Sequence, residues 1–162
     1  MWSINNEFKD ELSFYQDLHQ QLSSLISGEK NLVANLSNLS SYLYHSIPGL
    51  NWCGFYLWDH EDQELVLGPF QGKPACLRIK ANRGVCGASY SRNQSLRVDD
   101  VHEFPGHIAC DSASRSELVI PLRFEKNKWG VLDLDSPSLN HFSLLMEQEL
   151  QKIFDDLSPK IF

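Results

Sequence analysis

Three of the four cysteines in this chain follow the spacing C-x9-C-x23-C, at Cys76, Cys86 and Cys110. Such thiols can act as nucleophiles, redox partners or metal ligands, but a free cysteine is more often a small buried hydrophobic residue. Cys53 falls in an apolar run, and we expect it to be buried and inert. Cys110 lies in the stretch PGHIACDS, where no apolar pattern accounts for a buried thiol, so this cysteine is the one we expect to do chemistry.

Two histidines, His102 and His107, lie close to Cys110 in sequence. As a cation, either histidine would lower the pKa of the thiol and favour the reactive thiolate. The same three residues are also ligand types for zinc. No CxxC or CxxH pair supports a metal site, and the other cysteines lie far away at irregular spacing. Spacing therefore favours no metal, although a zinc site assembled by the fold stays open.

Three acidic residues accompany a predicted β-hairpin. In Leu132-Asp133-Leu134-Asp135 the strand period of two places both carboxylates on one face and both leucines on the other. Glu117 begins the partner strand. The acidic face is either a solvated outer surface of the sheet, which is the commoner arrangement, or the floor of an acidic pocket.

An aromatic stripe lies on another predicted strand. Trp52, Gly54, Tyr56 and Trp58 share one face by the same period. Such a stripe is more often core than ligand site. Here, however, the glycine would leave space, and the aromatic rings carry polar groups that could meet a ligand.

The apolar periodicity predicts an α/β (α+β) domain. Two amphipathic helices open the chain, one ending at Gly28 and one at Pro48-Gly49, and a third helix closes it over about 140–157. Between them, short strands are expected at 52–58, 64–67, 77–80, 95–98, 117–124 and 128–135, with a short helix at 84–92 and a loop at 99–114. Five or six short strands with flanking helices suggest an antiparallel sheet covered by helices on one face.

Composition limits the function. At 162 residues, one domain spanning 1–162 is the default. A net charge of −7 argues against a nucleic acid partner, which would require clustered Lys and Arg. The first residues carry no signal-peptide pattern, and no apolar run is long enough for a membrane span. We therefore expect a cytoplasmic protein with reduced thiols, without a membrane partner.

Four blocks of the chain, taken together, resemble one known family. HIACDSASRSELVIPL resembles the signature of the free methionine-(R)-sulfoxide reductases, and NWCGFYLW, GVCGASY and GVLDLDSP resemble its other blocks in order and spacing. The resemblance covers about residues 52–137. It implies a GAF domain, with a six-stranded antiparallel sheet and the N- and C-terminal helices packed on one face. It also implies reduction of free methionine (R)-sulfoxide to methionine, with electrons from thioredoxin and indirectly from NADPH, and without a bound cofactor.

The resemblance also implies roles for particular residues. Cys110 matches the nucleophile that forms a sulfenate, Cys76 the resolving cysteine, and Cys86 an accessory cysteine. The substrate pocket would be lined by two aromatic and three acidic residues: Trp52, Tyr56, Glu117, Asp133 and Asp135. A homodimer stays open. The alternative from another class is a non-catalytic GAF sensor that binds a small ligand, because one fold serves many functions.

Elementary chemistry agrees with these roles. A thiolate that attacks the sulfoxide sulfur needs an acid near the oxygen, and carboxyl groups packed together can hold a proton near neutral pH. The sulfenic acid then condenses with a second thiol, and a dithiol partner reduces the disulfide. Because Cys76 cannot take its bonding position while substrate is bound, we expect the segment Gly68–Cys76 to be a hinged loop that closes only in the oxidised state.

Overall fold

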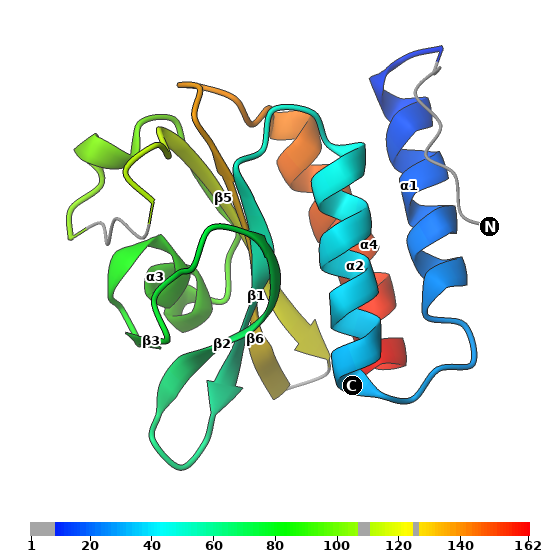
Figure 1. Cartoon of the computed structure of the whole chain (residues 1–162), viewed down its shortest axis with the longest axis horizontal. Coiled ribbons are helices and arrows are strands. Elements are labelled where there is room, and N and C mark those ends of the chain that lie inside the picture. Colours follow the sequence, from blue (N-terminus) through cyan, green and yellow to red (C-terminus); the bar gives the residue numbers. More distant parts are fainter. Residues whose placement is uncertain (1–8, 107–110, 125–126) are drawn as a thin grey trace.

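A six-stranded antiparallel sheet runs through the middle of the molecule (Figure 1), in the order β3-β2-β1-β6-β5-β4. The computed structural model describes residues 9–106, 111–124 and 127–162. The strands are β1 (Trp52–Asp59), β2 (Glu64–Gly72), β3 (Arg78–Lys80), β4 (Leu96–Val98), β5 (Ser116–Phe124) and β6 (Asn127–Ser136). Every neighbouring pair is antiparallel, as expected from the sequence.

Three helices cover one face of this sheet (Figure 1): α1 (Glu11–Leu25), α2 (Leu32–Ser46) and α4 (Leu144–Ile161). Side-chain caps fix where they begin, since Asp10, Asn31 and Ser143 each accept a hydrogen bond from a backbone N–H in the first turn. Helices α2 and α4 pack on the strands, whereas α1 packs mainly on α2 and α4 as an outer layer. The expected packing of N- and C-terminal helices on one face is confirmed. Within the described part of the chain, none of the helices combines the length and the apolar character needed to span a bilayer.

The sheet separates two apolar clusters, and the alternation of β1 distributes its side chains between them. Cys53 and Phe55 enter the larger cluster, under the helix layer. Trp52 and Tyr56 enter the smaller cluster on the opposite face. Residues on β6 divide in the same way, so that Leu132 and Leu134 lie in the larger cluster and Asp133 and Asp135 face the other side.

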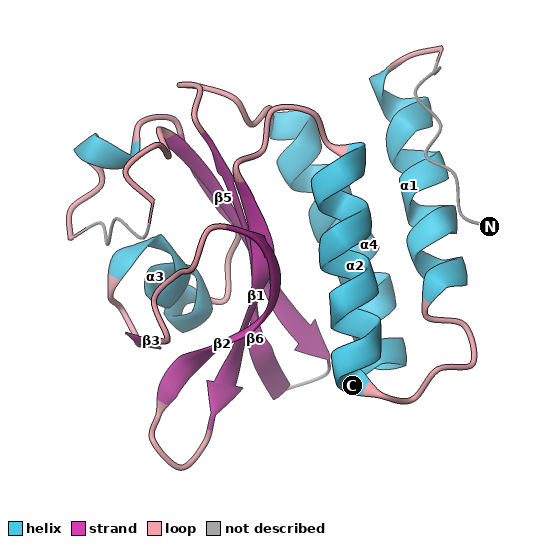
Figure 2. Cartoon of the chain, in the orientation of Figure 1, coloured by secondary structure: helices cyan, strands magenta, loops and turns pink. Residues whose placement is uncertain are grey.

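The short helix α3 (Gly84–Arg92) lies on that opposite face (Figure 2). A Cβ atom on Gly87 would lie 2.4 Å from the carbonyl oxygen of Lys80. Only glycine therefore lets α3 press against the turn that follows β3. This close approach places Cys86, in the first turn of α3, against the acidic side of the sheet.

The main departure from the expected elements is the length of β2, which continues to Gly72. Gly68 and Pro69 were expected to begin a loop, but they form an irregularity in the pairing with β1 at Phe55, and regular pairing resumes at Phe70. Proline and glycine are tolerated in a strand at such a bulge. The expectation of a hinge at Gly68 is therefore wrong, and the loop that carries Cys76 begins at Lys73. A short 3-10 helix, Val101–Glu103, lies within the expected loop.

Candidate active site

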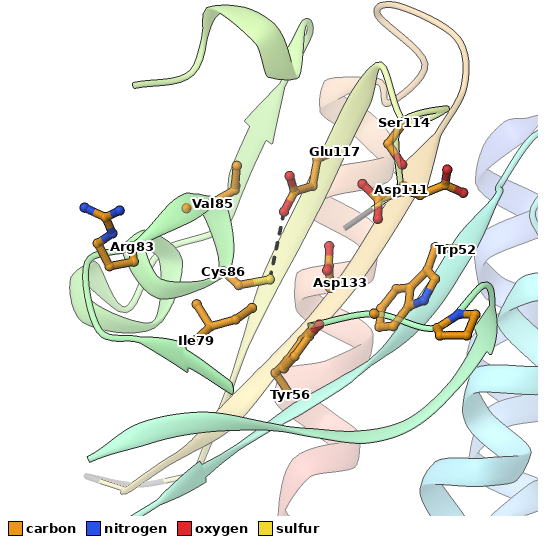
Figure 3. A pocket seen from close by; sticks show the side chains of 14 residues that line it. Trp52, Tyr56, Ile79, Arg83, Val85, Cys86, Asp111, Ser114, Glu117 and Asp133 are labelled. Carbon is orange, nitrogen blue, oxygen red and sulfur yellow. Dashed lines mark hydrogen bonds between the residues drawn. The ribbon is translucent and has the colours of Figure 1, made fainter. Parts of the chain in front are cut away.

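A pocket with an empty volume of about 520 Å³, including the part open to solvent, lies between α3, the sheet and the loop before β3 (Figure 3). Six of the eight site residues expected from the sequence line it: Trp52, Tyr56, Cys86, Glu117, Asp133 and Asp135. The loop contributes Pro74 and Ala75 to the wall directly before Cys76. Cys110 and His107 lie outside the described residues.

The three acids form the buried floor of this pocket and do not form a solvated face. Glu117 is 6% exposed and Asp133 7% exposed. Asp135 on β6 lies opposite both Trp52 on β1 and Glu117 on β5. The Cys86 sulfur and one carboxylate oxygen each from Glu117 and Asp133 all lie within 4.8 Å of one another (Figure 3). Helix α3 is what removes these acids from water, because it covers the face of the sheet on which they stand.

Burial raises the proton affinity of all three acids, and for Glu117 and Asp135 the charge of a neighbouring carboxylate adds to it. Burial, followed by the negative charge of Asp133, raises the pKa of Glu117 well above its usual range, and the same two causes raise the pKa of Asp135. Burial raises the pKa of Asp133 to about 6, against hydrogen bonds from Cys86, Glu117 and the Leu134 N–H that favour the anion. The floor therefore holds protons near neutral pH and can donate one.

Among the described residues, one carboxylate oxygen of the pocket floor receives no hydrogen bond. Asp133 Oδ1 is buried and accepts no hydrogen bond from any described residue. A buried carboxylate oxygen without a donor destabilises the fold, and a ligand that brings an N–H group or an ammonium into the pocket would satisfy it.

Cys86 is held as a thiol. Its sulfur donates a weak hydrogen bond to Glu117 Oε1 at 3.9 Å (Figure 3). Burial, and then the charge of Asp133, raises the pKa of this thiol well above its usual range. A thiol is a poor nucleophile, so these surroundings suit Cys86 to an accessory role rather than to attack. Cys53 is fully buried on the other side of the sheet, as expected.

Two aromatic residues of β1 form the apolar wall of the pocket. The Trp52 ring stacks on Phe70 at 5.3 Å and on Tyr56 at 5.9 Å between centroids. The space beside Gly54 is filled by Phe70, whose Cβ would lie 2.3 Å from a Cβ at that glycine. The expected gap in the stripe is therefore closed by a ring and is not open to a ligand. Trp58 stacks on Tyr90 at 4.2 Å and is not among the pocket residues.

The same two aromatic residues hold the loop that carries Cys76. The Trp52 indole N–H donates to the carbonyl oxygen of Lys73 at 3.0 Å, and the Tyr56 hydroxyl donates to that of Cys76 at 3.0 Å. Lys73 Nζ lies 3.2 Å from Asp111 Oδ1. Cys76 is disulfide-bonded, whereas Cys53 and Cys86 are free thiols. The loop is thus fastened to the pocket in an oxidised state of the chain.

Sequence reasoning missed a polar group at the rim of the pocket. Asn51 Nδ2 donates to Asp111 Oδ2 at 3.2 Å and to Ser114 Oγ at 3.0 Å. The Ala113 N–H is the main cause that holds the pKa of Asp111 below its usual range. Asp111 directly follows Cys110 and lies in the block that carried the resemblance, but Asn51 precedes its strand with no local signal.

Comparison with known proteins agrees with this fold and pocket. The GAF domain family matches residues 37–158. The free methionine-R-sulfoxide reductase of Escherichia coli (strain K12) is 48% identical over 91% of this chain and 88% of its own length. Protein YtsP of Bacillus subtilis (strain 168) is 46% identical over 99% of both chains. The crystal structure of free methionine-R-sulfoxide reductase from Neisseria meningitidis, in complex with its substrate, superposes with a TM-score of 0.93 at 38% identity, over 99% of this chain and 96% of that one. The chain therefore belongs to the GAF domain family and, within it, to the free methionine-R-sulfoxide reductases.

Proposed function

We propose that this chain is an oxidoreductase that reduces free L-methionine (R)-sulfoxide to methionine. The observation that carries the proposal is the buried floor of Glu117, Asp133 and Asp135 beneath the Trp52 and Tyr56 wall. A small zwitterion with a polar sulfoxide and an apolar methyl matches this combination of acids and aromatic rings. The (R) epimer is taken from the relatives with this named activity.

Two of the three acids of the floor have different tasks in this proposal. Asp133, the acid with a pKa of about 6, is the one that is ionised at neutral pH, and its free Oδ1 faces the substrate ammonium. Glu117 keeps its proton and gives it to the sulfoxide oxygen. Trp52 receives the methyl group against its ring. In a peptide the ammonium is absent, so methionine sulfoxide within proteins is a poor substrate.

The proposed chemistry proceeds through a sulfenate and a disulfide. The Cys110 thiolate attacks the sulfoxide sulfur while the oxygen takes a proton, and methionine leaves with sulfenic acid formed on Cys110. The Cys76 thiol then displaces that oxygen as water and forms a disulfide with Cys110. Thioredoxin reduces the disulfide and is itself oxidised, and NADPH restores the thioredoxin pool. The cytoplasm, where thiols are kept reduced, is the compartment in which this cycle runs.

The test is methionine formation by the purified chain with dithiothreitol, and NADPH oxidation with thioredoxin and its reductase. We expect turnover with free methionine (R)-sulfoxide and little with its N-acetyl derivative or the (S) epimer. Binding without turnover would replace the enzyme by the sensor alternative. If the purified protein contains zinc and a chelator abolishes its activity, the zinc alternative would replace the proposed chemistry.

A further inference from the structure

A leucine beside the disulfide is turned out to solvent. Leu77 follows Cys76 directly and is 74% exposed, the highest value among the large apolar side chains of the described residues. Cys76 itself is partly exposed and is already disulfide-bonded. Leu77 is therefore displayed in the oxidised form, which is the form that a reductant has to recognise. A single exposed leucine is common on protein surfaces, and it is the position of Leu77 beside the disulfide that makes it a candidate contact for a reductant.

The stretch of sequence around this leucine contains only basic charged residues, although the chain as a whole is acidic. The segment 73–83 has four basic residues and no acidic one, against a net charge of −7 for the chain. Two of these cations already have carboxylate partners. Lys73 pairs with Asp111, and Arg78 pairs with three acids, Asp59, Asp62 and Glu64. Lys80 and Arg83 are exposed and form no ion pair with any described residue. Two unpaired cations thus lie within six residues of Leu77 along the chain.

This segment is also a wall of the pocket, with Ala75 and Ile79 on the inner side and the exposed Arg83 at its edge (Figure 3). It lies across the sheet from α1, α2 and α4, at the edge formed by β3 (Figure 1). A protein that approaches this edge from solvent reaches Cys76 without disturbing the helix layer.

We propose that Leu77, Lys80 and Arg83, around Cys76, form the docking patch for the dithiol protein that reduces the disulfide. The proposal rests on the proposed function, and it commits to a thioredoxin-class partner with an apolar surface around its reactive cysteine and carboxylates at the rim. A thiolate of the partner attacks Cys76 Sγ, the disulfide breaks, and Cys110 leaves as a thiolate. The second thiol of the partner displaces Cys76, which leaves with a proton. The partner ends as a disulfide, and this chain gains two electrons.

The deciding experiment compares two reductants at saturating methionine sulfoxide, thioredoxin at varied concentration and dithiothreitol. Leu77→Asp should lower kcat/KM for thioredoxin roughly tenfold or more, because the leucine is buried on docking. The rate with dithiothreitol should not change, since a small dithiol needs no patch. Leu77→Met should retain the thioredoxin activity. The matched control is Val33→Asp, an apolar residue 64% exposed on α2 across the sheet, which should affect neither reductant.

The charged part of the patch has its own matched pair, Lys80→Ala and Lys30→Ala. Only Lys80→Ala should lower kcat/KM for thioredoxin at low salt. In this variant kcat/KM should also decrease less steeply with added salt than in the parent, because rim charges act on the association rate.

The outcomes separate the two proposals. Absence of methionine formation by the parent chain with dithiothreitol would overturn the proposed function. Normal activity with dithiothreitol, together with equal thioredoxin kinetics for Leu77→Asp and Val33→Asp, would overturn the docking patch alone. An equal loss with both reductants in Leu77→Asp would also overturn it, because that residue would then support the loop.

Discussion

Glu117 and Asp111 are carboxylates of the same pocket, and their neighbours shift their pKa values in opposite directions. Glu117 is surrounded by two other acids and a thiol, and burial keeps its proton on. Asp111 accepts hydrogen bonds from the Ala113 N–H, Asn51 and Lys73, all of which favour the anion. The pocket thus contains one carboxyl group that keeps its proton and one that stays ionised, and residue type alone does not distinguish the two.

Substitutions of Glu117 and Asp133 are expected to affect different kinetic constants. Glu117→Gln should lower kcat by roughly 10²–10⁴, the usual contribution of a general acid, with little change in KM. Asp133→Asn should raise KM more than it lowers kcat, because it removes a partner of the substrate ammonium. Steady-state kinetics with dithiothreitol would measure both, with Glu61→Gln, an exposed acid in the turn after β1, as control. Parent-like behaviour of both variants would show that the floor has no part in the reaction.

The cysteine variants are expected to differ in the number of methionine molecules that each enzyme molecule forms. Cys110→Ser should form no methionine even in a single turnover, because the nucleophile is gone. Cys76→Ser should form a single equivalent and then stop with thioredoxin as reductant, since no disulfide can form. Cys53→Ala, a change in the core on the other side of the sheet, serves as the control and should turn over normally. Rapid-quench analysis of methionine formed per enzyme is the measurement; a stoichiometric burst from Cys110→Ser contradicts the assignment.

At the scale of elements, the periodicity of two strands could be predicted from sequence, and their surroundings could not. The alternation of β1 correctly placed Cys53 and Trp52 on opposite sides of the sheet. Whether the acids of β6 meet water depends on α3, which follows β3 and packs back over that face. The extension of β2 was missed because Gly68 and Pro69 are loop residues by type, and only the pairing with β1 accommodates them as a bulge.

Hydrogen bonds between segments that are distant in sequence could not be predicted either. Asn51 reaches Asp111 across 60 positions, and the Tyr56 hydroxyl reaches the Cys76 carbonyl across 20. No local pattern encodes such hydrogen bonds. Of the expected site, the six residues in the pocket came from motif resemblance, whereas the polar group at its rim required the folded chain.

The loop is expected to loosen on reduction, over a shorter stretch than its composition suggests. Hydrogen exchange at 73–77 should be slower in the oxidised chain, where the disulfide and the hydrogen bonds from Trp52 and Tyr56 hold the segment. Residues 68–72 should be equally protected in both states, because they belong to β2. Exchange measured by mass spectrometry on both redox states would test this. Equal protection at 73–77 would mean that Cys76 is prepositioned.

For the whole molecule, the acidic floor has a cost in stability that depends on pH. A raised pKa means that the folded chain binds more protons than the unfolded chain between the two pKa values, so the free energy of unfolding falls as pH rises through that window. For Asp133 the window runs from 3.8 to about 6. A shift of this size corresponds to up to roughly 3 kcal/mol.

Asp133→Asn should therefore be more stable, relative to the parent, at about pH 7.5 than at about pH 5. Urea unfolding at both pH values would measure the difference, with Glu61→Gln, a change at an exposed residue, as the control. A gain in stability for Asp133→Asn that is the same at both pH values would show that the carboxyl has an ordinary pKa in the folded chain.

The hydrogen bonds from Trp52 and Tyr56 to the loop have a consequence for the kinetics of the whole cycle. Each of these side chains has a single polar hydrogen, and in the oxidised chain both hydrogens are engaged by loop carbonyls. Neither hydrogen is therefore available to a bound sulfoxide until the loop is released. For the proposed cycle we therefore expect ping-pong kinetics, with weaker binding of the sulfoxide to the oxidised chain than to the reduced chain. Excess sulfoxide should then cause little inhibition, and the rate of the proposed cycle should depend on the supply of reducing equivalents.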